Sequence, residues 1–273
     1  FIITDHNFRD ANPEWDDCRL RIQKLNDNHD GTMYITQGFI ANSVSPKTTT
    51  TLGREGSDFS AAIFANCLDA EELTIWKDVD GLRNADPKRF TVTEKIEHLS
   101  YFEAIELAFY GASIIHPKTL KPLQNKNIPL KVRSFLDTSL EPSVIDGTKD
   151  YIKYVPSYIV KERQTLMSIT PKDYSFMNEH NRALIFNIMD ELNIHANMTQ
   201  ISALVLSICF DENEKKRIML TDALSQAFKV KYNDGLKLFT IRHYQEGLEK
   251  DFIEDKKIYV EQRSRSTYQI VLE

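Results

Sequence analysis

Apolar runs typical of buried strands alternate with helical segments through the first half of the chain. Asn12-Pro13-Glu14 and the capping box Ser100–Glu103 mark two helix starts. We expect strands at residues 33–40, 72–76 and 129–134, and helices at 12–25, 59–68 and 100–111. This alternation predicts a layered α/β domain with a largely parallel sheet.

A different order of elements begins after an irregular segment at about 141–155, which we take as the domain boundary. It predicts a βαββα unit, most of a small split βαβ sandwich. A weak repeat of the same order follows, so two related modules are expected, the second degenerate. The elements of the first are expected at residues 164–170, 176–192, 195–201, 203–210 and 214–228, and those of the second at 236–243, 246–253, 257–262 and 267–271.

The 273-residue chain carries a net charge of −6. Such a chain lacks the basic footprint of a nucleic-acid-binding protein, so no nucleic-acid partner is expected. The longest apolar run, residues 203–210, is too short to cross a bilayer, and no membrane partner is expected. Cys18, Cys67 and Cys209 lie far apart in apolar segments, which predicts buried free thiols rather than metal ligands, and a cytoplasmic location.

The segment TTTTLGREGSDF, residues 48–59, places an arginine between two glycines at a predicted helix entrance. Either Ser57 or Asp58 is expected to cap the helix. Capping does not explain Arg54, whose planar fork can pair with two oxygens of a carboxylate or phosphate beside the helix amides. The glycines allow a ligand to approach the backbone closely. The loop is therefore predicted to bind an anion, although it is not a P-loop.

Four spaced segments, together with YITQGFI at residues 34–40, resemble the second half of the aspartokinase catalytic domain. The four are TTTTLGREGSDFSAAIFA, IWKDVDGLRNADPK, ELAFYGASIIHPKTL and IPLKVRS. The βαββα region resembles the ACT regulatory modules of the same family. The resemblance implies part of an amino-acid-kinase αβα sandwich at residues 1–145, a ferredoxin-like βαββαβ ACT module at 160–233 and a shortened second one at 234–273.

The resemblance further implies phosphoryl transfer from Mg-ATP to the side-chain carboxylate of L-aspartate, a reaction that depends on positioning and charge neutralisation. Mg²⁺ would be held through the phosphates rather than by the protein. Arg54 would bind an aspartate carboxylate, and Ser57 with the Gly38-Phe39 turn would shape that pocket. Asp58 would organise the active-site lysine and the transferring phosphate. Glu55 stands where many relatives have glycine and receives no role.

By the same resemblance, the nucleotide pocket would be lined by Lys77, Asp78, Arg83, Lys88 and Ser113. Lys77 and Asp78 end a predicted strand, and ligands in open α/β sheets gather at the carboxyl ends of strands. Ser113 replaces a phosphate-binding lysine of some relatives, which puts that contact in doubt. Trp76 is interpreted as a core residue, and His116 as a structural one.

In related ACT modules an amino-acid effector lies between the loop after the first strand and a facing strand of a second module. The candidate contacts here are Asp173, Ser175, Phe176, Asn197 and Ser202. Lysine is the first choice of effector and threonine the second. The modules are expected to join two copies of the chain into a homodimer.

The family's first glycine-rich loop, Lys-Phe-Gly-Gly-Thr-Ser, is not found in the chain. We therefore expect this polypeptide to be inactive alone, as a C-terminal fragment of an aspartate kinase of lysine, threonine and methionine biosynthesis. A non-catalytic, amino-acid-sensing regulatory subunit is the alternative, although such a sensor has little need of Arg54, Ser57 and Asp58. Another amino-acid or nucleotide kinase of this fold would leave the ACT region unexplained.

Overall fold

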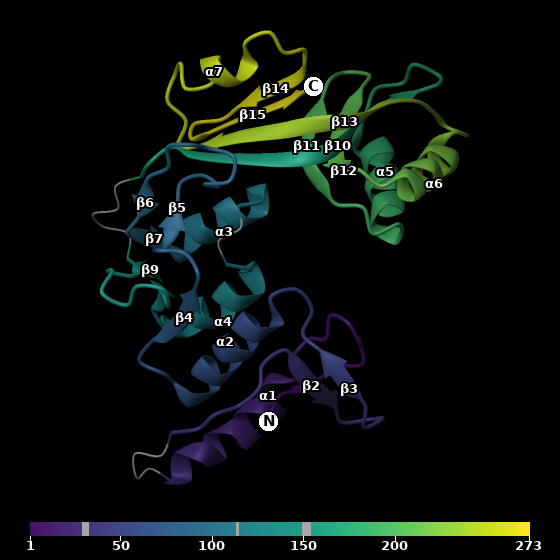
Figure 1. The fold of residues 1–273 in the computed structure, drawn as a ribbon. Helices are drawn as coiled ribbons and strands as arrows, with labels where there is room; N and C mark the ends of the chain where they lie inside the picture. Colours follow the sequence, from purple (N-terminus) through teal and green to yellow (C-terminus); the bar gives the residue numbers. More distant parts are fainter. Residues whose placement is uncertain (29–32, 113–114, 149–153) are drawn as a thin grey trace. The chain divides into compact units, whose positions relative to one another are not determined.

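The computed structural model describes residues 1–28, 33–112, 115–148 and 154–273, and its chain forms two compact units, Phe1–Val155 and Pro156–Glu273 (Figure 1). Among the described helices, none has both the length and the apolarity needed to cross a membrane. Each unit is described by itself below.

The first unit begins with a small three-stranded sheet in the order β1-β2-β3, with β1 parallel to β2. Buried apolar residues of the strands and helices form one core, which includes Cys18, Leu52, Ile63 and Cys67. The elements are β1 (Ile3–Thr4), α1 (Trp15–Ile22), the 3-10 helix η1 (Gln23–Asn28), β2 (Ile40–Ser43), β3 (Thr49–Thr51) and α2 (Gly56–Leu68).

A second sheet of this unit has the order β4-β8-β9-β7. Two of its pairs, β4 with β8 and β7 with β9, are parallel, while β8 and β9 are antiparallel, so the expected parallel arrangement is only partly realised. Ser100 caps α3 by accepting from the amide of Glu103, as its capping box predicts. The elements are β4 (Leu73–Lys77), the β5 (Leu82–Arg83) and β6 (Lys95–Ile96) pair, β7 (His98–Ser100), α3 (Tyr101–Tyr110), α4 (Pro117–Lys126), β8 (Leu130–Ser134) and β9 (Ser143–Asp146).

The strand predicted at residues 33–40 is not formed, since β2 begins only at Ile40 and residues 33–38 have no regular secondary structure. Met33 and Ile35 are 85% and 92% exposed. An apolar run becomes a strand only where a neighbouring strand accepts its hydrogen bonds and covers its side chains. None of the described residues pairs with this run.

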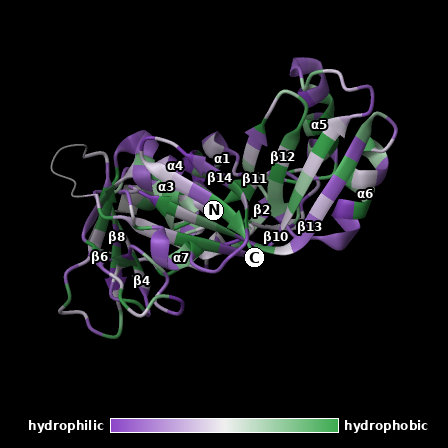
Figure 2. Ribbon diagram, turned by 90° about the horizontal axis from the view of Figure 1, so that it is seen from above, coloured by the Kyte–Doolittle hydropathy of each residue, from purple (hydrophilic) through white to green (hydrophobic). Residues whose placement is uncertain are grey.

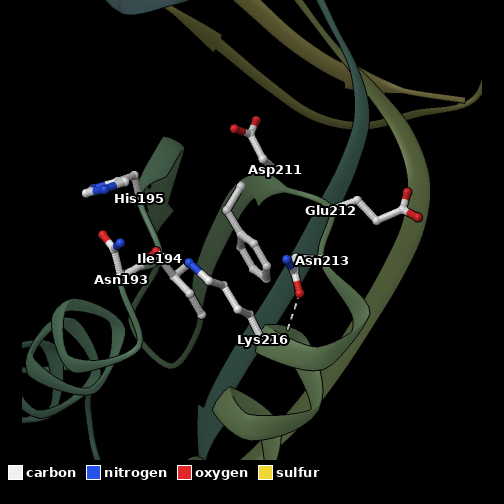
Figure 3. Close-up of a pocket in the computed structure, with 8 residues that line it drawn as sticks. Asn193, Ile194, His195, Asp211, Glu212, Asn213 and Lys216 are labelled. Atoms are coloured by element: carbon white, nitrogen blue, oxygen red, sulfur yellow. Dashed lines mark hydrogen bonds between the residues drawn. The ribbon is translucent and has the colours of Figure 1, made fainter. Parts of the chain in front are cut away.

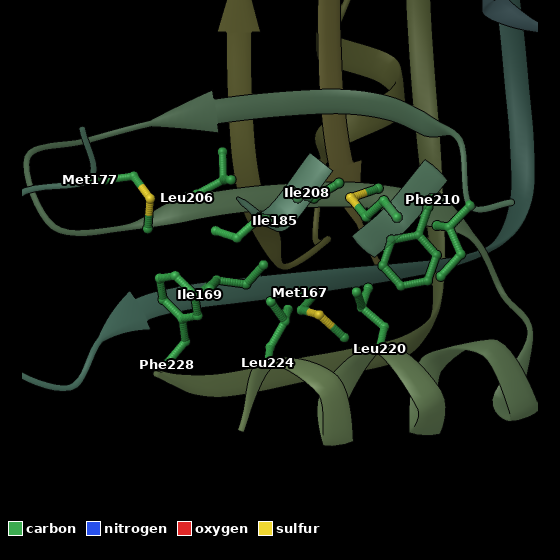
Figure 4. Close-up of a cluster of buried hydrophobic side chains, with 12 residues drawn as sticks. Met167, Ile169, Met177, Ile185, Leu206, Ile208, Phe210, Leu220, Leu224 and Phe228 are labelled. Atoms are coloured by element: carbon green, nitrogen blue, oxygen red, sulfur yellow. The ribbon is translucent and has the colours of Figure 1, made fainter. Parts of the chain in front are cut away.

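The second unit is built on a six-stranded sheet in the order β11-β12-β10-β13-β15-β14. Its strands alternate apolar and polar residues (Figure 2). Apolar side chains from the strands and from α5 and α6 point toward one another and form a core that includes Met167, Ile185, Phe210 and Leu220 (Figure 4). The elements are β10 (Ser157–Pro171), α5 (Glu179–Glu191), β11 (Ala196–Ile201), β12 (Leu206–Asp211), α6 (Glu214–Leu224), β13 (Phe228–Arg242), α7 (Lys250–Ile253), β14 (Ile258–Arg263) and β15 (Thr267–Leu272).

The strands expected to form two consecutive modules lie together in this one sheet. The second half of β10 pairs with the first half of β13, while residues 157–161 of β10 pair with 238–242 of β13. The predicted boundary between residues 233 and 234 therefore falls inside β13. Irregular pairing near Gln164 separates the two halves, and Arg163 has a φ of 54° there.

Candidate active site

The loop that carries Arg54 ends at the N-terminus of α2. Glu55, with a φ of 55° in the left-handed region, is the N-cap residue and makes no side-chain capping bond. The Gly56 amide donates to the Gly53 carbonyl at 3.2 Å, and this turn makes Gly56 the first helical residue. The prediction that Ser57 or Asp58 caps the helix is therefore wrong, because the helix begins before both and they lie in its first turn.

The turn at Gly38 and Phe39 packs directly on this helix entrance. A Cβ at Gly38 would lie 3.0 Å from the Cα of Ser57, so a larger residue would push the two segments apart by a few tenths of an ångström. The Phe39 amide donates to the hydroxyl of Ser60 at 2.8 Å, and that hydroxyl donates to the Gly56 carbonyl. The structure thus brings together the residues predicted to shape the aspartate pocket.

Arg54 is exposed, and within the described residues it makes no hydrogen bond or ion pair. The backbone amides of Ser57 and Asp58 likewise have no acceptor among those residues. Free amides in the first turn of a helix carry partial positive charge. An uncommitted arginine in the loop that leads to two uncommitted amides is chemically suited to a carboxylate.

Asp58 and Lys77 connect the start of α2 to the end of β4. The Lys77 ammonium lies 3.4 Å from the Asp58 carboxylate, and the two side chains are 29% and 17% exposed. Asp78, the next residue, is exposed. The pair places one cation and one anion at the carboxyl end of a parallel strand, where α/β proteins bind ligands.

The other residues predicted for the nucleotide pocket are arranged differently. The Arg83 guanidinium forms a bidentate pair with Asp80 at 2.7 and 3.1 Å and also donates to Thr93, so its donors are engaged within the protein. Lys88 is exposed. Ser113 lies outside the described residues.

The prediction that Trp76 is a core residue is wrong. Trp76 is 48% exposed, and the guanidinium of Arg133 lies 5.9 Å from the centre of its ring. The side chain stands on an edge strand, because β4 is the first strand of its sheet and, among the residues that the structure describes, pairs with β8 alone. An aromatic ring at such an edge can remain half-exposed while a guanidinium covers one face.

Glu55, to which the sequence assigns no role, connects α2 to α4. Its carboxylate accepts the backbone amide of His116 at 2.9 Å. The His116 ring caps α4 by accepting from the amide of Lys118 at 3.2 Å, which agrees with its structural interpretation. A contact across 61 positions has no local signal in the sequence.

Comparison with known proteins shows which proteins this chain resembles. Residues 3–134 match the model of the amino acid kinase family. The crystal structure of E. coli aspartokinase III in complex with aspartate and ADP superposes with a TM-score of 0.81 at 25% identity, over 99% of this chain and 64% of that one. The chain is similar to aspartokinases.

Curated aspartokinases show the same similarity in sequence. Aspartokinase 1, chloroplastic, of Arabidopsis thaliana is 30% identical over 186 residues, which are 68% of this chain and 33% of that protein. Bifunctional aspartokinase/homoserine dehydrogenase 2, chloroplastic, of Zea mays is 28% identical over 233 residues, 84% of this chain and 25% of that protein. The chain therefore spans about a quarter to a third of the length of these aspartokinases.

In the second unit, four of the predicted effector residues lie in two neighbouring loops. The Asp173 carboxylate accepts the Ser175 amide at 3.0 Å, and the Met177 amide, just after Phe176, donates to the Ala203 carbonyl next to Ser202. Phe176 is 72% exposed. These contacts join the loop before α5 to the one between β11 and β12.

Asn197, the fifth predicted effector residue, lies in a different environment. Its amide donates to Gln164 and Asp211, both at 2.8 Å, and its oxygen accepts from Lys161 at 2.7 Å. Burial alone would raise the pKa of Asp211, but the hydrogen bonds from Gln164 and Asn197 and the charge of Lys161 outweigh it and hold that pKa below its usual value. The structure thus places Asn197 in a partly buried polar network with Lys161, Gln164 and the exposed Asp211.

A cavity of about 280 Å³ opens beside this network at the start of α6 (Figure 3). Lys216 donates to the Asn193 carbonyl across its rim and its amide to the Asn213 side chain. The cavity lies at the N-terminal end of β11, away from the loop that contains Ser202, so the predicted effector residues do not line it. Its lining residues are Asn193, Ile194, His195, Phe210, Asp211, Glu212, Asn213 and Lys216.

Proposed function

We propose that this chain forms the aspartate-binding part of an aspartate kinase. The observation that carries the proposal is Arg54, an exposed arginine without a protein partner in the described residues, in the loop that leads to the free first-turn amides of α2. The similarity to E. coli aspartokinase III, solved with aspartate and ADP, supports this ligand class. Arg54 and the amides would hold a carboxylate of aspartate, with Gly38, Phe39 and Ser57 beside it.

In the proposed reaction, an oxygen of the aspartate side-chain carboxylate forms a bond to the γ-phosphorus of ATP. The bond from that phosphorus to the β,γ-bridging oxygen breaks, and ADP leaves with the electron pair. Lys77 would neutralise charge on the phosphates, and Asp58 would hold its ammonium in place at 3.4 Å. No proton transfer is required, since aspartate is ionised near neutral pH.

The described residues fit ATP in part. Lys77 and the exposed Lys88 and Asp78 are available for the nucleotide and its Mg²⁺, whereas the donors of Arg83 are already engaged. Within the described ranges, no group of three or more His, Cys, Asp or Glu side chains is arranged to hold a metal ion. We propose that the phosphates carry the Mg²⁺, and that this chain alone does not catalyse the reaction.

Binding and turnover of aspartate test the function. Calorimetry of this chain should show aspartate binding that Arg54→Ala abolishes and Arg54→Lys weakens, because a lysine lacks the bidentate fork. Arg21→Ala, which removes an exposed arginine from α1, is the matched control. The complete natural protein should form ADP only when aspartate is present. Turnover of a different amino acid in its place would overturn the proposal.

We further propose that the second unit is a pair of ACT modules that bind an inhibitory amino acid and join two chains. The βαββαβ order of β10, α5, β11, β12, α6 and β13 supports this proposal. Lysine is the first candidate effector and threonine the second, with Asp173, Ser175, Phe176 and Ser202 as contacts. Calorimetry with lysine, threonine and methionine tests it, and binding of none would exclude it. Sedimentation of the chain tests the dimer.

A further inference from the structure

Glu55 adopts an unfavourable backbone conformation directly beside the proposed substrate-binding arginine. Its φ of 55° lies in the left-handed region, where a side chain with a Cβ is strained and glycine is not. A glutamate is therefore kept at a position where glycine fits better. Strain of this kind persists only where surrounding contacts hold it, and it is concentrated at functional sites.

The contact that holds Glu55 is its bond to α4. The Glu55 carboxylate accepts the His116 amide at 2.9 Å, and both residues are half-buried. His116 cannot turn away, because its ring caps α4 through Lys118 and Pro117 follows it as the first helical residue. Hydrogen bonds to a charged acceptor are stronger than neutral ones, so this contact fixes both backbone segments.

The loop that carries Arg54 depends on this anchor for its position. Within the described residues the Arg54 side chain has no partner, so the backbone of the loop is what sets the point from which this side chain extends. The peptide between residues 54 and 55 is held on one side by the left-handed conformation and the bond of Glu55. On the other side Leu52 donates its amide to Phe39. A freely turning loop would lose this orientation and bind a carboxylate less well.

We propose that Glu55 is a positioning residue that anchors the Arg54 loop to the N-terminus of α4 and so preorganises the carboxylate site. The proposal rests on the proposed binding of aspartate by Arg54. It assigns Glu55 no contact with the substrate. A purely structural glutamate would stabilise the fold without altering the affinity for aspartate.

Three substitutions separate positioning from stability. Glu55→Gly removes the anchor but also the strain, so the unfolding midpoint should stay within about 3 °C of the wild type. Its Kd for aspartate should nevertheless rise roughly tenfold. Glu55→Ala removes the anchor and keeps the strain, so its unfolding midpoint should fall and its Kd for aspartate should rise. Glu55→Gln keeps an acceptor oxygen, so its Kd for aspartate should stay within about twofold of the wild-type value.

The measurements are calorimetry with aspartate and thermal unfolding of this chain, followed by KM and kcat of the complete natural protein. Asn193→Gly is the matched control, because it relieves a φ of 52° in the second unit. The positioning role would be overturned if Glu55→Gly and the wild type bound aspartate equally well. It would also be overturned if Glu55→Gln bound aspartate as weakly as Glu55→Ala. A wild type that binds no aspartate would instead overturn the proposed function.

Discussion

The Lys77 ammonium lies 3.4 Å from the Asp58 carboxylate, which joins the end of β4 to the first turn of α2. Both side chains are less than one-third exposed. The pair therefore stands in a half-buried position, where a cation directed at a phosphate is screened less than at the surface. It links the residue proposed to neutralise phosphate charge to the helix proposed to hold aspartate.

We expect Lys77→Ala to reduce kcat of the complete natural protein about a hundredfold, because one charge that stabilises the transferring phosphoryl group is lost. Stability should fall by less than about 1 kcal/mol, since partly exposed ion pairs contribute little. Steady-state kinetics and urea unfolding measure the two effects. Lys131→Ala is the control. Lys131 lies on the neighbouring strand β8 and pairs with Glu72, and its loss should leave kcat unchanged. An unaltered kcat for Lys77→Ala would exclude its role.

Gly56 allows the Phe39 ring to pack against the start of α2. A Cβ at this position would lie 2.6 Å from Cδ2 of Phe39. We expect Gly56→Ala to lower the free energy of unfolding by about 1–3 kcal/mol through overpacking and to weaken aspartate binding as the turn at residues 38–39 shifts. Urea unfolding and calorimetry measure these changes. Gly235→Ala, where a Cβ meets nothing within 4 Å, should cost only the strain of its positive φ and leave aspartate affinity intact.

Local patterns in the sequence predict features whose causes are local. The capping box at Ser100 is of this kind, since its chain neighbours decide it. The close approach of Gly38 to Ser57 joins residues from separate turns and is expected only from the resemblance to a known family. The pairing of β10 with the two halves of β13 is not predictable in this way, because it joins residues far apart in the chain. The prediction that Trp76 is buried fails for the same reason, because the exposure of its side chain depends on which strand lies at the edge of the sheet.

Asn197 is expected to stabilise the fold rather than to bind an effector. Asn197→Ala removes the hydrogen bonds donated to Gln164 and Asp211 and the one accepted from Lys161, and should lower the free energy of unfolding at pH 7 by about 1–3 kcal/mol. Urea unfolding tests this, with the exposed Asn233→Ala as a control that should change it by less than about 0.5 kcal/mol. If Asn197→Ala lost lysine or threonine binding while its free energy of unfolding stayed unchanged, Asn197 would instead be an effector-binding residue.

The stability of the same variant at low pH gives a second test of this network. Because the folded pKa of Asp211 is depressed, its carboxylate contributes stability above about pH 4 that is lost as the pH falls through the folded value. Asn197→Ala removes one of the bonds that lower this pKa. The loss of stability on acidification below about pH 4 should therefore be smaller in the variant than in the wild type.

His116 should make the stability of the first unit sensitive to mild acid. Burial lowers the pKa of His116 from its ordinary value of 6.5, and the positive charges of Lys118 and Arg54 act in the same direction, while Glu55 and Asp10 oppose them. The unfolded chain then binds more protons than the folded one between the folded pKa and 6.5, so stability falls as the pH drops through this window. Physically, protonation of Nδ1 removes the acceptor that caps α4.

His116→Asn isolates this effect, because asparagine caps a helix as well as histidine does here but does not titrate. The backbone amide that Glu55 accepts is retained in the variant. The difference in unfolding free energy between wild type and variant should change by up to about 1 kcal/mol on going from pH 7.5 to pH 5, in favour of the variant at pH 5. Urea unfolding at the two pH values measures it. A difference that is independent of pH would show that the imidazole stays neutral throughout this range, or that the cap contributes nothing.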